Sequence, residues 1–365
     1  MDRDWGEKNM GAQTDVIMIS GFLGSGKTTL LNGLLKSIPG GYRVVVLMNE
    51  FGEIGIDGPV LQGEDFDILE INRGSIFCIC VKRDFITALN KIASEVKPDV
   101  LIMEPTGVAN PGDLKSDFML PFLNNRFRLL EQICILDFEY FEEAYGAFVS
   151  VEKQIASSSL FVINKVDVAS REKIERIKQV VRGHHPSPQF MESVFCNIPF
   201  DSILRKMGDA GGICDASGQT AGKPLSSKEL DEVLSLILSD PFREVTPPDN
   251  LMSSAYSWRG DGIAEFREFL NELPKGVVRG KGFLKDAGKT YLLNMVMGNF
   301  SIGEFHSPVH AELLGKVVLI FPPDLEETVA QVAARWRSRL EELRVDPGGD
   351  CGPASFEKSA SVSAQ

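Results

Sequence analysis

The chain has no long hydrophobic run, no excess of positive charge and no apolar segment near its start. No stretch of the 365 residues approaches the ~20 consecutive apolar residues of a membrane-spanning helix, so we expect no membrane partner. Residues 1–15 are polar and lack an apolar signal core, which predicts a cytoplasmic protein. Lys and Arg number 38 against 51 Asp and Glu, for a formal charge of −13. This balance argues against a nucleic-acid partner, because phosphate backbones bind clustered positive charge.

Cysteine and histidine are also scarce, with six and four residues respectively. In a reducing compartment, scattered cysteines indicate free thiols or metal ligands, not a disulfide framework. Only Cys78 and Cys80 are close in sequence. His306 and His310 flank Pro308, which disfavours a continuous helix, so we expect a surface loop there.

Apolar runs alternate with amphipathic stretches over the first two hundred residues. This alternation is typical of an α/β fold with a mostly parallel sheet covered by helices on both faces. The expected strands are 16–20, 43–48, 66–71, 100–103, 132–136 and 160–163, and the expected helices include 28–37, 84–96 and 171–182.

The later part of the chain predicts a smaller α+β domain. Its expected elements are a helix at 227–239, a strand at 251–258, a helix at 262–272, strands near 277–284, 290–297 and 316–321, and a helix at 324–343. Gly, Ala and Ser dominate the segment before it, which indicates a linker. We therefore divide the chain into a flexible start (1–13), a first domain (14–206), a linker (207–226), a C-terminal domain (227–345) and a disordered tail (346–365).

The segment GFLGSGKT at 21–28 fits the phosphate-loop pattern G-x-x-x-x-G-K-[ST]. Small residues let consecutive backbone N–H groups close around phosphates, and the N-terminus of the following helix adds a favourable dipole. An apolar run precedes the motif and an amphipathic stretch follows it, as the pattern requires. The expected phosphate-binding residues are Gly21, Gly24, Ser25, Gly26, Lys27, Thr28 and Thr29.

A second motif, Asn164-Lys165-Val166-Asp167, follows the apolar run 160–163. The carboxylate of Asp167 can accept hydrogen bonds from both N1–H and the exocyclic amine of guanine. Two nucleotide motifs in this order, each behind a strand, predict GTP and GDP as ligands, bound through Asn164, Lys165 and Asp167. The alternative for the second motif is an ordinary strand-to-helix loop, where Asn and Asp are common.

The apolar strand before Glu104 ends in that carboxylate and is followed by Pro105-Thr106-Gly107. Such a carboxylate can hold a water of Mg²⁺ that Thr28 ligates directly, while the N–H of Gly107 approaches the γ-phosphate. We expect Lys27, Glu104 and Gly107 to form the catalytic set. The alternative is that Glu104 merely caps a loop.

Residues 49–57, NEFGEIGID, place three carboxylates in a glycine-broken loop after the second strand. The position suits a switch segment that folds against nucleotide or metal, although a plain charged loop would look the same.

These motifs resemble those of the CobW-type GTPases. The resemblance is carried by GFLGSGKTTLLNGLL, NEFGEIGIDG, the EPTG segment, NKVD and VRGKG at 278–282, and it spans roughly residues 14–340. The family is grouped with the HypB and UreG nickel-insertion GTPases and with the MeaB-type chaperones of cobalamin enzymes. The resemblance implies a P-loop GTPase domain, a C-terminal CobW-type domain, weak GTP hydrolysis, and metal delivery or metal-cofactor assembly. It also puts Glu104 in the place of the usual Walker B Asp.

The chain departs from the family's Gly-Cys-x-Cys-Cys segment after the third strand. Aligned on Gly74, Ser75 and Phe77 replace two cysteines, Cys78 keeps the third, and Cys80 is extra. Two thiolates cannot complete a tetrahedral Zn²⁺ shell by themselves. Glu50, a bridging second subunit or a client could supply further ligands for Zn²⁺ or a similar ion; alternatively, the two cysteines are buried and structural.

The leading hypothesis is therefore a slow, Mg²⁺-dependent GTPase that acts as a metallochaperone or assembles a metal cofactor. Its partner would be a client metalloenzyme or a cofactor-assembly protein, and a homodimer is possible. Slow hydrolysis is expected because no Gln or Arg is obviously placed to orient water or neutralise the transition state. One alternative is a GTP-gated chaperone of a corrinoid or metalloenzyme that carries no metal. Another is a P-loop small-molecule kinase, which the guanine motif disfavours.

Overall fold

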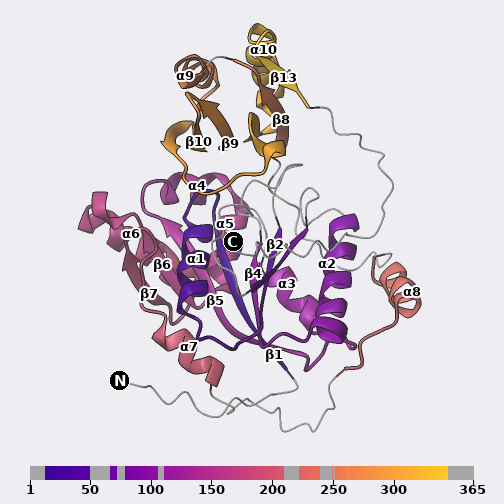
Figure 1. The fold of residues 1–365 in the computed structure, drawn as a ribbon. Helices are drawn as coiled ribbons and strands as arrows, with labels where there is room; N and C mark the ends of the chain where they lie inside the picture. Colours follow the sequence, from indigo (N-terminus) through magenta and orange to yellow (C-terminus); the bar gives the residue numbers. More distant parts are fainter. Residues whose placement is uncertain are drawn as a thin grey trace.

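The computed structural model describes residues 13–49, 66–71, 79–105, 111–208, 222–238, 249, 251–260 and 262–343. In these ranges the chain forms two β-sheets, each with its own helices (Figure 1). The larger sheet has seven strands in the order β3-β2-β4-β1-β5-β6-β7, and the smaller has six in the order β11-β10-β9-β12-β8-β13. The predicted fold class, an α/β domain followed by a smaller α+β domain, is confirmed.

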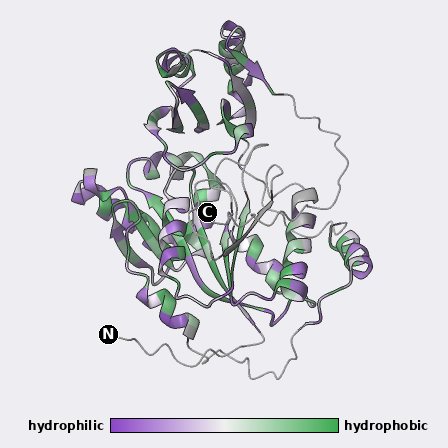
Figure 2. Ribbon diagram, in the orientation of Figure 1, coloured by the Kyte–Doolittle hydropathy of each residue, from purple (hydrophilic) through white to green (hydrophobic). Residues whose placement is uncertain are grey.

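Every pair of neighbouring strands in the larger sheet is parallel within the described ranges. Their apolar residues alternate between two helical layers: Val16 and Met18 pack on the side of α2 and α3, while Ile17 and Ile19 pack on the side of α1 and α7. Burial on both faces explains the near-continuous hydrophobic strands, which are green in Figure 2. The strands are β1 (Thr14–Gly21), β2 (Val44–Asn49), β3 (Phe66–Ile71), β4 (Val100–Glu104), β5 (Phe127–Asp137), β6 (Leu160–Asn164) and β7 (Gln189–Ser193).

The helices of this domain follow the predicted pattern, with additional short ones between β4 and β6 and after β7. Helix α2 continues directly into a π-helical segment, η2 (Ile92–Val96). The helices are α1 (Lys27–Ser37), α2 (Ile79–Lys91), α3 (Pro111–Phe118), α4 (Phe141–Ala147), α5 (Val149–Ser157), η3 (Val166–Val168), α6 (Arg171–His184), α7 (Asp201–Gly208) and α8 (Ser227–Leu238).

Helix α8 packs on the first domain, although the sequence grouped this segment with the second. Leu230 and Leu234 join the hydrophobic cluster of α2, and Arg83 Nη2 lies 2.5 Å from Asp231 Oδ1. Asn90 exchanges two hydrogen bonds with the backbone of Leu225, at 2.8 and 2.9 Å. The apolar stripe of an amphipathic helix shows that the helix packs on another part of the protein but not on which part. The sequence could therefore not show which domain this helix packs on.

The smaller sheet is antiparallel and carries its helices on one face. The predicted helix 324–343 is wrong in its second half, because α10 ends at Arg335 and the chain turns to pair Leu340 with Trp258. The elements are β8 (Met252–Trp258), α9 (Gly262–Glu272), β9 (Arg279–Asp286), β10 (Lys289–Val296), β11 (Asn299–Glu304), η4 (Ala311–Leu313), β12 (Lys316–Phe321), η5 (Pro323–Leu325), α10 (Glu326–Arg335) and β13 (Leu340–Glu342).

The free face of the smaller sheet lies against the first domain. Phe283, Val318 and Ile320 share one hydrophobic cluster with Phe22 and Leu23, which belong to the loop after β1. In Figure 1, β9 and β10 accordingly stand next to α4 at the end of the larger sheet. None of the helices in the described ranges is long and apolar enough to cross a membrane.

Candidate nucleotide-binding site

The loop between β1 and α1 requires glycine at three positions. Gly21, Gly24 and Gly26 have φ angles of 143°, 78° and 114°, in the region that side-chain-bearing residues rarely adopt. A Cβ on Gly21 would lie 2.6 Å from the Ile135 carbonyl oxygen, and one on Gly26 would lie 2.7 Å from Asn164 Nδ2. The loop therefore has the tight glycine-dependent backbone that a phosphate cradle needs.

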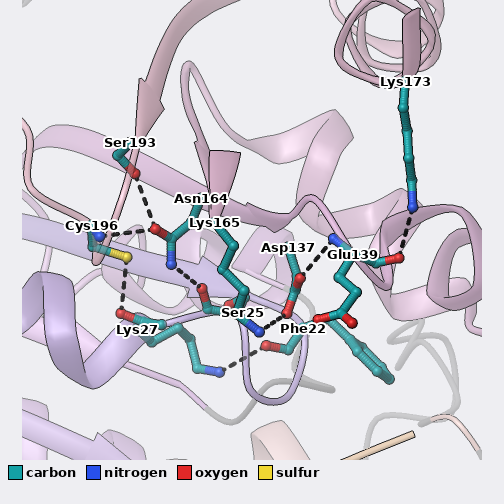
Figure 3. Close-up of polar contacts among 11 residues, drawn as sticks. Phe22, Ser25, Lys27, Asp137, Glu139, Asn164, Lys165, Lys173, Ser193 and Cys196 are labelled. Carbon is teal, nitrogen blue, oxygen red and sulfur yellow. Dashed lines mark hydrogen bonds and ion pairs between the residues drawn. The ribbon is translucent and has the colours of Figure 1, made fainter. Parts of the chain in front are cut away.

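Helix α1 begins at Lys27, whose side chain is only 6% exposed. Its Nζ donates a hydrogen bond to the Phe22 carbonyl oxygen at 3.3 Å, as Figure 3 shows. Burial lowers the pKa of Lys27 to about 8, although the negative charge of Glu104 opposes the shift. The cost of burying this ammonium group is only partly offset by Glu104 and the Phe22 carbonyl, so the group is suited to bind a negatively charged ligand.

Glu104 stands at the end of β4, 6% exposed, and its Oε1 accepts a hydrogen bond from Thr28 Oγ1 at 3.2 Å. Burial raises the pKa of this carboxyl group, while Lys27 and Thr28 lower it. Its second oxygen, Oε2, is buried and has no hydrogen-bond partner among the described residues, and the same holds for Ser25 Oγ. The sequence predicted that Thr28 and Glu104 would meet, and the structure brings them together.

This pair fits Mg²⁺, which prefers oxygen ligands and usually keeps several of its waters. The hydroxyl of Thr28 would hold the ion, and the partnerless oxygen of Glu104 would hold one of its waters. The bound ion would supply positive charge to the phosphates. The hydroxyl of Ser25 is buried inside the loop, whereas Thr29, the last residue predicted at the phosphates, is exposed.

Asn164 joins the second motif to the phosphate loop (Figure 3). Its Nδ2 donates to the Ser25 carbonyl oxygen at 2.9 Å, and its Oδ1 accepts from the Cys196 N–H at 2.9 Å and from Ser193 Oγ at 3.2 Å. Cys196 Sγ in turn donates to the Gly26 carbonyl oxygen at 3.4 Å. Asn164 therefore holds the loop against the end of β7 and positions both parts of the site.

Lys165 and Asp167 lie just beyond β6. Lys165 is in the left-handed region, with φ 66°, and its Nζ is 2.6 Å from Asp137 Oδ2 and 5.6 Å from the centre of the Tyr140 ring. Asp167 lies in the short helix η3 and is exposed. Its carboxylate is therefore accessible to the guanine base of a nucleotide, as the motif requires.

Sequence reasoning missed Asp137, Ser193 and Cys196. Each lies at or just after the carboxyl end of a parallel strand, where ligands of α/β sheets bind. That rule could have identified Asp137, because its strand was predicted, but β7 was not. Burial raises the pKa of the Cys196 thiol to about 12, which suits a structural cysteine and not a metal ligand.

The predicted transition-metal site falls largely outside the described residues. Glu50 and Cys78 lie outside them, as does Gly107 of the predicted catalytic set. Cys80 belongs to the first turn of α2, and its side chain is outside the description. Among the residues that the structure describes, no group of three or more His, Cys, Asp or Glu side chains could hold a metal ion. His306 and His310 are exposed, in the loop that the sequence predicted.

The parallel sheet, the glycine-dependent loop and the buried Lys27 define a P-loop nucleotide-binding domain. The model of the CobW/HypB/UreG nucleotide-binding domain matches residues 15–192. Residues 15–192 therefore resemble the nucleotide-binding domain of this family, as the sequence motifs predicted.

Two curated relatives and one solved structure illustrate the similarity. "Zinc-regulated GTPase metalloprotein activator 1" of Dictyostelium discoideum is 26% identical over 227 residues, covering 52% of this chain and 47% of the relative. "Zinc chaperone YeiR" of Escherichia coli is 32% identical over 163 residues, covering 44% and 49%. The Zn(II)-bound YjiA GTPase of E. coli is 20% identical, covers 88% of this chain and 98% of its own, and has a TM-score of 0.40. The chain thus spans about half the length of these curated relatives.

Proposed function

We propose that this protein binds GTP, hydrolyses it slowly and uses the cycle to handle a metal ion for a client protein. The observation that carries the proposal is the junction at Asn164. Its amide joins the guanine-reading segment to the phosphate loop through the 2.9 Å hydrogen bond to Ser25, so one ligand can span both motifs. A guanine nucleotide has the base and the phosphates for this span.

The metal part of the proposal is supported by what the relatives are named for. The YeiR relative is a "zinc chaperone", and the Dictyostelium relative is a "zinc-regulated GTPase metalloprotein activator". We propose Zn²⁺ or a comparable divalent ion as the cargo. Its ligands would be the thiolates of Cys78 and Cys80 with the carboxylate of Glu50, completed by client or second-subunit groups, because thiolates favour such ions over Mg²⁺.

Hydrolysis would use the residues around the γ-phosphate. Lys27 would pair with the β- and γ-phosphates, Glu104 would hold a water of the Mg²⁺ ligated by Thr28, and Gly107 would offer its N–H. Slow turnover is proposed because this set contains no residue that orients the attacking water.

The competing proposal is a GTP-gated chaperone that holds its client but carries no metal. It is favoured by Ser75 and Phe77, which replace two cysteines of the family's cluster. The two versions share the nucleotide site and differ only at the cysteine segment.

The experiment that separates them measures Zn²⁺ binding by the native protein loaded with GDP or with a non-hydrolysable GTP analogue. We expect binding that differs between the two nucleotides and is lost in the Cys78→Ser, Cys80→Ser double variant, with GTP affinity unchanged. Cys351→Ser serves as a thiol-matched control and should bind Zn²⁺ normally. Identical Zn²⁺ titrations of the double variant and the native protein in both nucleotide states would remove the metal role and leave the metal-free chaperone.

A further inference from the structure

One face of the smaller sheet presents Arg279 toward the first domain. Arg279 begins β9, and its register partners are Val296 of β10 and Ile320 of β12. Directly paired residues of an antiparallel sheet project to the same face. Ile320 belongs to the cluster that contains Phe22 and Leu23 of the phosphate loop, so this is the face turned to the first domain.

Independent contacts support this orientation. The next residue, Gly280, faces the other side, since a Cβ there would lie 3.1 Å from both Leu319 Cδ2 and Met295 Cβ, in the cluster under α9 and α10. On the near side, Val296 touches the phosphate loop itself, because a Cβ on Gly24 would collide with its methyl groups. Arg279 is therefore the direct neighbour, on the adjacent strand, of Val296, which packs on the phosphate loop.

The charge of Arg279 acts on the residues at the phosphate end of the site. The pKa of Lys27 is lowered mainly by burial and also by the positive charge of Arg279. The same guanidinium lowers the pKa of Glu104 against the raising effect of burial. Lys27 and Glu104 are the residues proposed at the γ-phosphate, so the charge of Arg279 reaches that end of the site.

A second contact between the domains involves Asn299, the first residue of β11. The Asn299 side chain lies close enough to the Tyr140 hydroxyl to lower its pKa against the raising effect of burial, and the Tyr140 ring is the one that Lys165 Nζ approaches. The β10–β11 hairpin thus contacts both the phosphate loop, through Val296, and the neighbourhood of the guanine-reading segment. The second domain consequently packs directly on the nucleotide site and is not joined to the first domain by the linker alone.

We propose that Arg279 is a catalytic residue supplied by the second domain, whose guanidinium binds the γ-phosphate of GTP and neutralises charge during its hydrolysis. The inference rests on the proposed GTPase function and adds a second positively charged group, besides Lys27, for the γ-phosphate. Water forms a bond to the γ-phosphorus as the bond to the β–γ bridging oxygen breaks, yielding GDP, phosphate and a proton. Negative charge then grows on the bridging and γ oxygens, where a guanidinium is effective.

The proposal also makes the second domain a sensor of the nucleotide. GTP offers Arg279 a γ-phosphate and GDP does not, so the contact between the domains is strengthened in one state only. An interaction that distinguishes two ligands is what a switch needs.

The test compares Arg279→Ala, Arg279→Gln and the native protein for GDP affinity, GTP-analogue affinity and single-turnover GTP hydrolysis. A charge-assisted hydrogen bond predicts that both substitutions weaken GTP-analogue binding about 10- to 150-fold, leave GDP affinity within about twofold, and slow hydrolysis by at least the same factor. Aluminium fluoride should stabilise bound GDP in the native protein and not in either variant, because the mimic of the transferring phosphoryl group requires the guanidinium.

Arg335→Ala is the control, because it removes the same positive charge at a site away from the nucleotide. Arg335 lies on α10, on the face of the smaller sheet that is turned away from the first domain, and pairs there with Glu272 at 2.8 Å. Should the alanine variant fail to bind GDP, Arg279→Gln decides the question by its ratio of GTP-analogue to GDP affinity. A native ratio, native hydrolysis rate and native fluoride response in the decisive variant would overturn the inference. A native protein that neither prefers guanine nor hydrolyses GTP would instead overturn the proposed function.

Discussion

At the scale of single residues, we propose that guanine selectivity depends on Asp167, which is exposed just beyond β6. Its carboxylate can accept two hydrogen bonds from guanine, each worth roughly 1.5–3 kcal/mol for a charged acceptor. We predict that Asp167→Asn weakens GTP binding about 10- to 150-fold and improves binding of xanthosine triphosphate, whose C2 carbonyl can accept from the new amide. Fluorescent-nucleotide competition measures both. Glu172→Gln, an acid-to-amide change on α6, should leave both affinities alone, and an unaltered preference in Asp167→Asn would contradict the assignment.

Gly26 offers a backbone test of the same site. A Cβ there would lie 2.7 Å from both Asn164 Nδ2 and Cys196 Sγ, at a φ of 114°. We predict that Gly26→Ala abolishes tight nucleotide binding and costs about 1–3 kcal/mol in the free energy of unfolding, measured by denaturant titration.

The matched control is Gly183→Ala in α6, where an added Cβ has open space. It should raise the free energy of unfolding by roughly 0.5–1 kcal/mol and leave nucleotide binding unchanged. Equal nucleotide affinity in both alanine variants would show that the loop geometry is not what binds the phosphates.

The buried Lys27 makes nucleotide binding depend on pH. Its pKa in the free protein is about 8, and bound phosphates must raise it because they favour the charged form. Above pH 8 the free amine is mostly neutral, so binding takes up a proton and affinity falls as pH rises; below that value the amine is already charged.

Calorimetry of GDP binding in two buffers with different ionisation enthalpies measures this uptake. We expect about three quarters of a proton at pH 8.5 and close to none at pH 6.5. No difference between the buffers at pH 8.5 would mean that Lys27 is already charged before the phosphates arrive.

At the scale of elements, α8 is held by its apolar stripe and not by the second domain. Leu234 is 1% exposed in the cluster with α2, whereas Leu236, two residues on, is 73% exposed. We predict that Leu234→Ala lowers the free energy of unfolding of the first domain by about 2–5 kcal/mol, while Leu236→Ala changes it by less than about 0.5. Thermal or denaturant unfolding measures both, and equal effects would contradict this packing.

Whether a strand could be recognised from the sequence depended on how much of it is buried. β1, β4 and β6 are apolar on both faces, so their runs were recognisable, and the motif residues at their ends followed. β11 could not be recognised, because its residues Asn299–Glu304 are mostly polar and exposed, and β13 has only three residues. These strands exist through pairing with neighbours, which is a tertiary effect.

At the scale of the whole molecule, the sequence identified two domains but not how they meet. Asn164 and Ser25 were predicted in one site, because both motifs belong to one parallel sheet. Arg279 was part of a recognised motif, yet the motif alone does not show that its charge acts on Lys27 and Glu104. That effect depends on the packing of the second sheet against Phe22 and Leu23.

The central claim is that one guanine nucleotide spans the phosphate loop and the Asn164–Asp167 segment. The most direct measurement is equilibrium competition of GTP and ATP for the native protein loaded with a fluorescent GDP analogue in the presence of Mg²⁺. One charge-assisted hydrogen bond to Asp167 is worth about 10- to 150-fold in affinity, so two such bonds predict that GTP displaces the analogue at a concentration at least that much lower than ATP does. Displacement by ATP and GTP at equal concentrations would contradict the account.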